Sequence, residues 1–183
     1  MLIFELADES TVTPATIYKA TDESEVGERI EIMGWGAYGP EGRRPQNYGE
    51  FHAGENRVED IWNGMLTYKL SDPADADSGA LEKEVLAYDG DSGSPAFIDV
   101  NGEQQIAGLN SFGECCNYGH RDFYTRLGGV SYDWIKAVIE ENTAHDESGN
   151  CPAYPTIGFD LDESDVEDAI EMWDKDDDKK LTR

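Results

Sequence analysis

Residues 90–95 read Gly-Asp-Ser-Gly-Ser-Pro and combine a nucleophile with the makings of a sharp turn. Glycine on both sides of the Asp-Ser pair lets the backbone bend tightly, which would leave the Ser92 hydroxyl exposed and let neighbouring N–H groups converge. Acyl transfer needs such convergent donors, because its tetrahedral intermediate carries an oxyanion. Ser92 is therefore the candidate nucleophile, and the N–H groups of Gly90 and Ser92 are the candidate oxyanion hole.

The alternative interpretation is an ordinary glycine-rich hairpin turn, since Asp-Gly and Ser-Gly are common turn dipeptides. At ordinary glycine and proline usage, the pattern Gly-Asp-Ser-Gly-x-Pro should arise by chance in on the order of one in several thousand chains of this length. Chance is a poor explanation, so the acyl-transfer interpretation is preferred.

The same stretch resembles the nucleophile loop of the chymotrypsin-like (trypsin-like) serine proteases, Gly-Asp-Ser-Gly-Gly-Pro, with Ser94 in place of the last glycine. Four further stretches resemble segments of that family and follow in the family's order. They are the Gly-Trp-Gly strand at 34–36, the strand beside the specificity pocket at 106–113, the last strand at 123–127 and the closing helix from 132.

The resemblance covers only the second half of the family's fold. It implies an all-β protein, a chymotrypsin-like antiparallel Greek-key barrel that is the C-terminal barrel of a two-barrel fold, with a closing C-terminal helix. The expected organisation is a partial peptidase domain over residues 1–145, a linker over 146–160 and an EF-hand-like segment over 161–183. The implied activity is serine endopeptidase hydrolysis of peptides or proteins through an acyl-enzyme on Ser92, with no cofactor required.

The resemblance also implies roles for residues around Ser92. Asp91 matches the aspartate that pairs with a new N-terminal amine after zymogen cleavage. The residues that match the family's substrate pocket are Leu86, Ser111, Phe112, Gly113 and Asp122.

Two pocket positions depart from the trypsin pattern. Leu86 stands where trypsin-like enzymes carry an aspartate at the pocket floor, and Asp122 replaces a glycine in the last strand. The Asp122 carboxylate could attract a basic side chain from the opposite wall, or it could narrow the pocket and favour small residues. We favour a preference other than that of trypsin.

The family's catalytic histidine and aspartate have no counterpart in this chain. The expected aspartate would fall immediately before Met1, and the histidine further upstream. His52 lies in a polar, Gly-rich segment, His120 near the pocket-edge loop and His145 in the acidic tail. A surface histidine is far more often structural or solvated than catalytic, so none of the three is assigned as the general base. We therefore expect a fragment or a late start, and no proteolysis by this chain alone. The alternative is a non-catalytic, protease-like binding module that responds to calcium.

Periodicity predicts the elements that would position the loop. Residues 28–35 alternate apolar and polar side chains, as does a half-buried strand, and 57–58 and 65–70 read as further strands. Trp134, Ile135, Val138 and Ile139 fall on one face of a helix over 132–141. Residues 34–39 formally match the dinucleotide pattern G-x-G-x-x-G, but the Pro-rich stretch that follows cannot begin the required helix.

The formal net charge of −26 argues against nucleic acid or an anionic membrane as a partner, because both would be repelled. No apolar run approaches the roughly 20 residues that span a bilayer, and no signal peptide is visible. An extracellular location is implied by the resemblance alone. Three cysteines, Cys115, Cys116 and Cys151, leave the disulfide pairing open.

The last residues resemble the start of an EF-hand. A capping box at 164–167 opens a predicted amphipathic helix, and an acidic loop follows it directly. Lys179 replaces the glycine needed for the sharp turn, and the chain ends before the twelfth loop position, so we expect weak calcium binding at most. The candidate calcium ligands are Asp174, Asp176, Asp178, Lys180 and Thr182.

Overall fold

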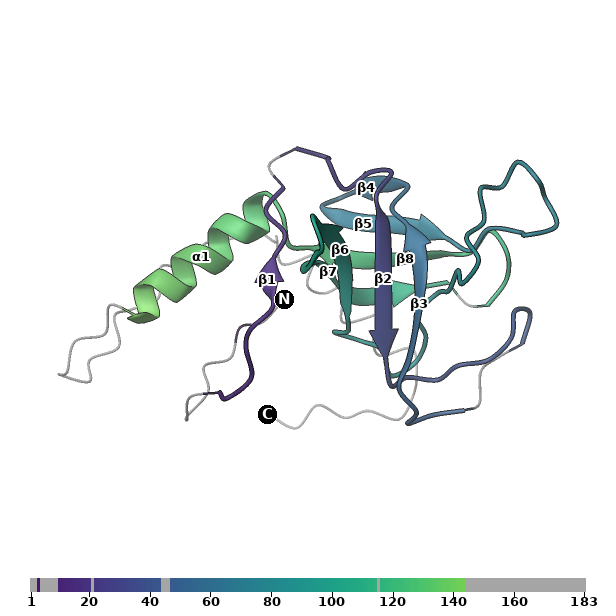
Figure 1. Ribbon diagram of the computed structural model, residues 1–183, viewed down its shortest axis with the longest axis horizontal. Coiled ribbons are helices and arrows are strands. Elements are labelled where there is room, and N and C mark those ends of the chain that lie inside the picture. The colour runs from purple at the N-terminus through teal and green to yellow at the C-terminus, as the bar shows by residue number, and fades with distance from the viewer. Residues whose placement is uncertain (1–2, 4–9, 21, 44–46, 115, 144–183) are drawn as a thin grey trace, which may run out of the picture. The chain divides into compact units, whose positions relative to one another are not determined.

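The computed structural model describes residues 3, 10–20, 22–43, 47–114 and 116–143, which form eight strands and one helix (Figure 1). The elements in chain order are β1 (Thr16–Ile17), β2 (Arg29–Gly34), β3 (His52–Arg57), β4 (Asp60–Trp62), β5 (Met65–Lys69), β6 (Pro95–Val100), β7 (Glu103–Gly113), β8 (Arg121–Arg126) and α1 (Val130–Thr143).

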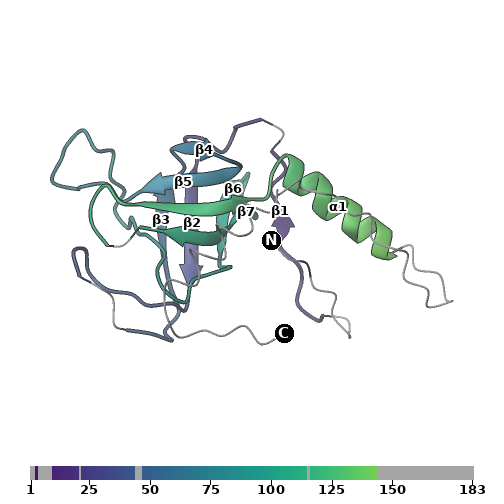
Figure 2. The same cartoon turned by 180° about the vertical axis from the view of Figure 1, so that it is seen from behind.

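The strands form a single curled sheet in the order β3-β2-β6-β7-β8-β5-β4. Every neighbouring pair on this path is antiparallel, and the short β1 lies beside β7 in parallel. β2 and β3 run across β5 and β8, as Figures 1 and 2 show from opposite sides. The curl brings β3 against β5, where the Asn56 side-chain amide donates to the Lys69 carbonyl at 3.0 Å. The predicted antiparallel β architecture is confirmed as a curled half-barrel. The Greek-key connection and the assignment to the C-terminal barrel of a two-barrel fold stay predictions.

The core fills the inside of this curl. In β2 the side chains of Ile30 and Ile32 are buried while Arg29 and Glu31 are exposed, which confirms the predicted half-buried strand. The rings of Tyr68 and Tyr124 lie 5.5 Å apart on β5 and β8, and neither is exposed to solvent. The other buried apolar side chains of this cluster are Val58, Leu66, Ala87, Ala96, Ile98 and Ala107.

Strand β3 is longer than predicted, because its buried positions are polar and therefore break the apolar pattern. Glu55 forms an ion pair with Arg29 and accepts a hydrogen bond from the Lys83 N–H. The Asn56 side chain donates to two backbone carbonyls. Pairing of this kind offsets the cost of burying polar groups, so a polar sequence here still forms a partly buried strand at the end of the sheet.

Helix α1 confirms the predicted closing helix but begins earlier. Its first residues follow Gly129, whose N–H donates to the Ala20 carbonyl, and the Lys19 ammonium lies 5.3 Å from the Tyr132 ring centre. Ile135 is buried, whereas Ile139 on the predicted apolar face is 51% exposed. The helix is therefore covered at its start and only partly along this face.

Several predicted features lie outside the described residues. These are the linker over 146–160 and the EF-hand-like segment over 161–183 with its calcium ligands. Among the described residues there is no helix with the length and apolar character needed to span a membrane.

Candidate active site

The Ser92 turn lies immediately before β6. Ser92 is exposed, and the flanking Gly90 and Gly93 have φ angles of 97° and 82°, which side chains strongly disfavour. The Asp91 N–H donates to the Tyr88 carbonyl at 2.9 Å, and the Gly93 N–H donates to the Asn110 carbonyl of β7 at 3.0 Å. The turn is therefore fixed by one hydrogen bond to the residues that lead into it and by another to β7.

Two N–H groups of this turn remain available. Within the described part of the chain, neither Gly90 nor Ser92 donates its backbone N–H to another group, although the N–H groups of Asp91, Gly93 and Ser94 all do. These are the two donors that the sequence assigned to an oxyanion hole. An acceptor brought to Ser92 could therefore bond to both of them.

Asp91 lies beneath the turn and is only 5% exposed. Its Oδ1 accepts the Gly36 N–H at 2.9 Å and its Oδ2 accepts the Tyr88 N–H at 3.1 Å. Gly36 has no room for a side chain, because a Cβ there would lie 2.7 Å from the Asp91 nitrogen. The Gly-Trp-Gly stretch that the sequence singled out is thus the wall against which Asp91 packs.

A hollow of about 270 Å³ opens beside Ser92. Four of the five predicted pocket residues line it, namely Ser111, Phe112, Gly113 and Asp122. Leu86 does not line it and lies in a separate cavity. Sequence reasoning missed Asp89 and Glu114, which add two exposed carboxylates to the hollow, together with Ala87, Tyr88 and Asn110.

Asp122 is the buried acid of this hollow, with 1% of its surface exposed. Its Oδ2 accepts the Ala87 N–H at 2.5 Å and the Tyr68 hydroxyl at 3.2 Å. Its Oδ1 is buried and accepts no hydrogen bond from the described residues, and a Cβ on Gly113 would collide with it. Burial, more than the repulsion from Asp91, raises the pKa of Asp122 to about 7.

Aromatic rings extend from the hollow across the neighbouring strands. Phe112 stacks on Phe123 with ring centres 4.5 Å apart, and Phe123 meets the edge of Trp62 at 5.6 Å. Phe112 and Trp62 are each 50% exposed. The sequence indicated Phe112 alone, because the other two rings are brought beside it only by the pairing of β8 with β7 and β5.

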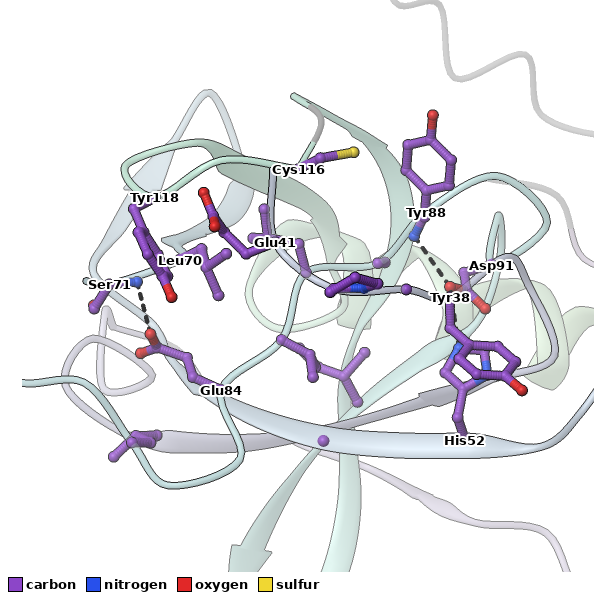
Figure 3. A pocket seen from close by; sticks show the side chains of 18 of the residues that line it. Tyr38, Glu41, His52, Leu70, Ser71, Glu84, Tyr88, Asp91, Cys116 and Tyr118 are labelled. Atoms are coloured by element: carbon purple, nitrogen blue, oxygen red, sulfur yellow. Dashed lines mark hydrogen bonds and ion pairs between the residues drawn. The ribbon is translucent and has the colours of Figure 1, made fainter. Parts of the chain in front are cut away.

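A second cavity of about 290 Å³ contains Leu86 (Figure 3). At one end Asp91, His52 and Tyr38 lie together, and at the other the Glu84 carboxylate accepts the Ser71 N–H at 2.6 Å. His52 Nε2 lies 3.7 Å from Asp91 Oδ2, which makes an ion pair when the imidazole is protonated. Neither described histidine, His52 or His120, lines the hollow that contains Ser92.

Comparison with known proteins finds matches to a family model, to a protein sequence and to solved structures. The family model described as Trypsin matches residues 5–135. Vitamin K-dependent protein C of Oryctolagus cuniculus is 28% identical over 136 residues, which are 68% of this chain and 28% of that protein. The structure of neuropsin, a serine protease expressed in the limbic system of mouse brain, matches with a TM-score of 0.51 at 19% identity, over 70% of this chain and 54% of that one.

The last of these likenesses concerns the fold alone. The chain spans between about a quarter and a half of the length of these two relatives. The family match extends over most of the described residues and includes the Ser92 turn, the hollow and the start of α1. The chain therefore belongs to the trypsin family of serine proteases.

Proposed function

We propose that this chain carries the nucleophile, oxyanion hole and substrate pocket of a serine endopeptidase. The observation that supports the proposal best is the Ser92 turn itself. The exposed Ser92 hydroxyl lies beside the hollow, next to two backbone N–H groups that have no acceptor among the described residues. The Asp91 carboxylate fixes the backbone that carries them. This is what acyl transfer to serine requires from the part of the enzyme that holds the nucleophile.

In the proposed reaction, Ser92 Oγ attacks the carbonyl carbon of the scissile bond. The carbonyl oxygen becomes an oxyanion and accepts the N–H groups of Gly90 and Ser92. The amine then leaves, and water hydrolyses the Ser92 ester. Removing one such donor typically costs on the order of 10²–10³ in kcat, so the backbone of this turn would supply much of the rate.

The general base would come from residues outside the described ones. His52 is engaged with Asp91, and neither it nor His120 lines the hollow of Ser92. A serine without a base is an ordinary alcohol, so we expect the chain by itself to be inactive.

An extended peptide would bind along β7 beside Ser92. β6 pairs with β7 only as far as Leu109, whereas β8 pairs with β7 to Gly113. One backbone edge of residues 111–113 is therefore open to strand addition, next to the hollow. The carboxyls of Asp89, Glu114 and Asp122 line that hollow, and none of the described residues that line it is basic. This lining favours a cationic substrate side chain, which reverses the preference other than that of trypsin that the sequence favoured.

The proposed location is extracellular. Cys116 is disulfide-bonded, which suits an oxidising compartment. The other two cysteines lie outside the described residues, so the pairing stays open.

The calcium-binding alternative depends on residues 174–182, which the structure does not describe. Within the described residues, no group of three or more His, Cys, Asp or Glu side chains is placed to hold a metal ion. In the acidic loop at 71–79, the carboxylates of Asp72 and Asp75 each accept a nearby backbone N–H, so they stabilise turns of the loop itself.

The test compares this chain with a longer polypeptide that includes the coding sequence upstream of Met1. We expect peptide hydrolysis only by the longer protein, and its loss in Ser92→Ala. Robust hydrolysis by the pure short chain that disappears in Ser92→Ala would show that the base lies within it and would overturn this assignment.

A further inference from the structure

Asp91 is a buried carboxylate with few donors. Each of its oxygens accepts one backbone N–H, from Gly36 and from Tyr88, although a carboxylate can accept about four hydrogen bonds. A buried charge is costly unless an opposite charge lies close to it. Among the described residues, His52 is the basic side chain that lies within ion-pair distance of Asp91.

The two ring nitrogens of His52 both face acceptors. Nδ1 lies 3.0 Å from the backbone carbonyl oxygen of Glu50, and Nε2 lies 3.7 Å from Asp91 Oδ2. A neutral imidazole has one N–H and one lone pair, so either tautomer would direct a lone pair at an oxygen. Only the imidazolium can donate towards both groups.

The other charged groups around His52 also favour a cation. The Tyr38 ring lies 5.3 Å from the His52 ring, and its hydroxyl donates to the Glu50 carboxylate at 2.5 Å. The remaining carboxyl, amino and guanidinium side chains of the cavity are three acids and one base, namely Glu41, Glu82, Glu84 and Arg43. Acidic groups therefore outnumber basic ones on the cavity walls.

We propose that protonated His52 is a positioning residue, the internal cation that fixes Asp91 and thereby the Ser92 turn. Asp91 stands between Gly90 and Ser92, so a change in its position moves both proposed oxyanion donors. The family resemblance implies a chain amine as the partner of this aspartate. Here a side chain of β3 reaches the same carboxylate from within the chain (Figure 3). The catalytic consequence depends on the proposed function, whereas the ion pair does not.

The proposal makes the backbone of the turn respond to pH. While His52 is charged, the ion pair holds Asp91. Deprotonation removes the charge and leaves the buried carboxylate with its two N–H donors alone.

The test is an NMR titration of the full chain labelled with ¹⁵N, from pH 5 to 9. Long-range ¹H–¹⁵N spectra report the charge of each histidine ring, and amide spectra report residues 90–93. We expect the amides of the turn to shift at the same midpoint as the His52 ring. Turn amides that do not follow His52 would overturn the proposal.

Two variants separate this role from general folding. In His52→Gln the inflection of the turn amides should vanish, whereas in the control His120→Gln it should persist. An inflection that survives His52→Gln would assign the response to another group and refute the proposal. The readout is protonation and backbone position, so a lack of peptidase activity in the longer protein would leave the result standing.

Discussion

Replacing Asp122 with asparagine should flatten the pH dependence of folding stability between pH 5 and 8. The substitution keeps a carbonyl oxygen that can accept the Ala87 N–H and the Tyr68 hydroxyl, and it removes the ionisation. Asp122 is almost completely buried, and one of its oxygens has no hydrogen-bond partner in the described structure. The folded protein therefore favours the neutral acid.

The size of the effect follows from the pKa. Burial raises the pKa of Asp122 from 3.8 to about 7. Ionising Asp122 therefore costs about 4 kcal/mol more in the folded protein than in the unfolded one. Because the folded-state pKa lies above the unfolded one, this contribution is complete below pH 4 and is lost as pH rises through 7. Between pH 5 and 8 the loss from this group amounts to about 2–3 kcal/mol.

The assay is urea unfolding of the wild type and Asp122→Asn at several pH values. The difference in unfolding free energy between the two proteins isolates this group from the other acids. Asp89→Asn is the matched control, because Asp89 lines the same hollow but is exposed. A constant difference between wild type and Asp122→Asn from pH 5 to 8 would show that Asp122 does not carry the burial cost argued here.

Two further predictions follow from neighbouring groups. Arg126→Met should lower the unfolding free energy by about 3–5 kcal/mol, because it leaves the fully buried Glu25 carboxylate without the two bonds, at 2.7 and 2.9 Å, that the guanidinium donates. Lys136→Met removes an exposed ion pair and should lower the unfolding free energy by less than about 1 kcal/mol in parallel urea curves. An equal loss of unfolding free energy in the two variants would contradict the argument. An aromatic amidine should bind the hollow more tightly at pH 8 than at pH 6 by calorimetry, because Asp122 ionises near pH 7, and the gain should be absent in Asp122→Asn. Affinity that is independent of pH would show that this carboxyl does not face the cation.

Local chemistry made the nucleophile turn and strand β2 predictable. Glycine permits the positive φ angles that a sharp turn needs, and the structure has them at Gly90 and Gly93. Apolar and polar residues alternate along β2 because one face of the strand is buried, and such alternation can be recognised from the local sequence. The four pocket residues around Ser92 were indicated by resemblance, and the structure brings them to one hollow.

The remaining features depend on contacts between distant parts of the chain. Strand β3 was predicted only at its end, because Glu55 and Asn56 are buried through polar pairs that a hydrophobic pattern cannot show. His52 and Asp91 are brought together by packing of β3 beneath the Ser92 turn, so a sequence search for a general base gave no reason to link them. Leu86 was assigned to the hollow of Ser92 by resemblance, whereas it lines the other cavity together with Val85, Ala87 and Tyr88.

The central claim is that Ser92 is the nucleophile of a serine endopeptidase. The most direct measurement is reaction of the longest polypeptide encoded by the mapped 5′ transcript with a fluorophosphonate, followed by peptide mass spectrometry. The account predicts one phosphonylated residue, Ser92, with labelling lost in Ser92→Ala and at background in residues 1–183 alone. A longer protein that carries a histidine- and aspartate-bearing half but leaves Ser92 unlabelled, or that is labelled at a different serine, would contradict it.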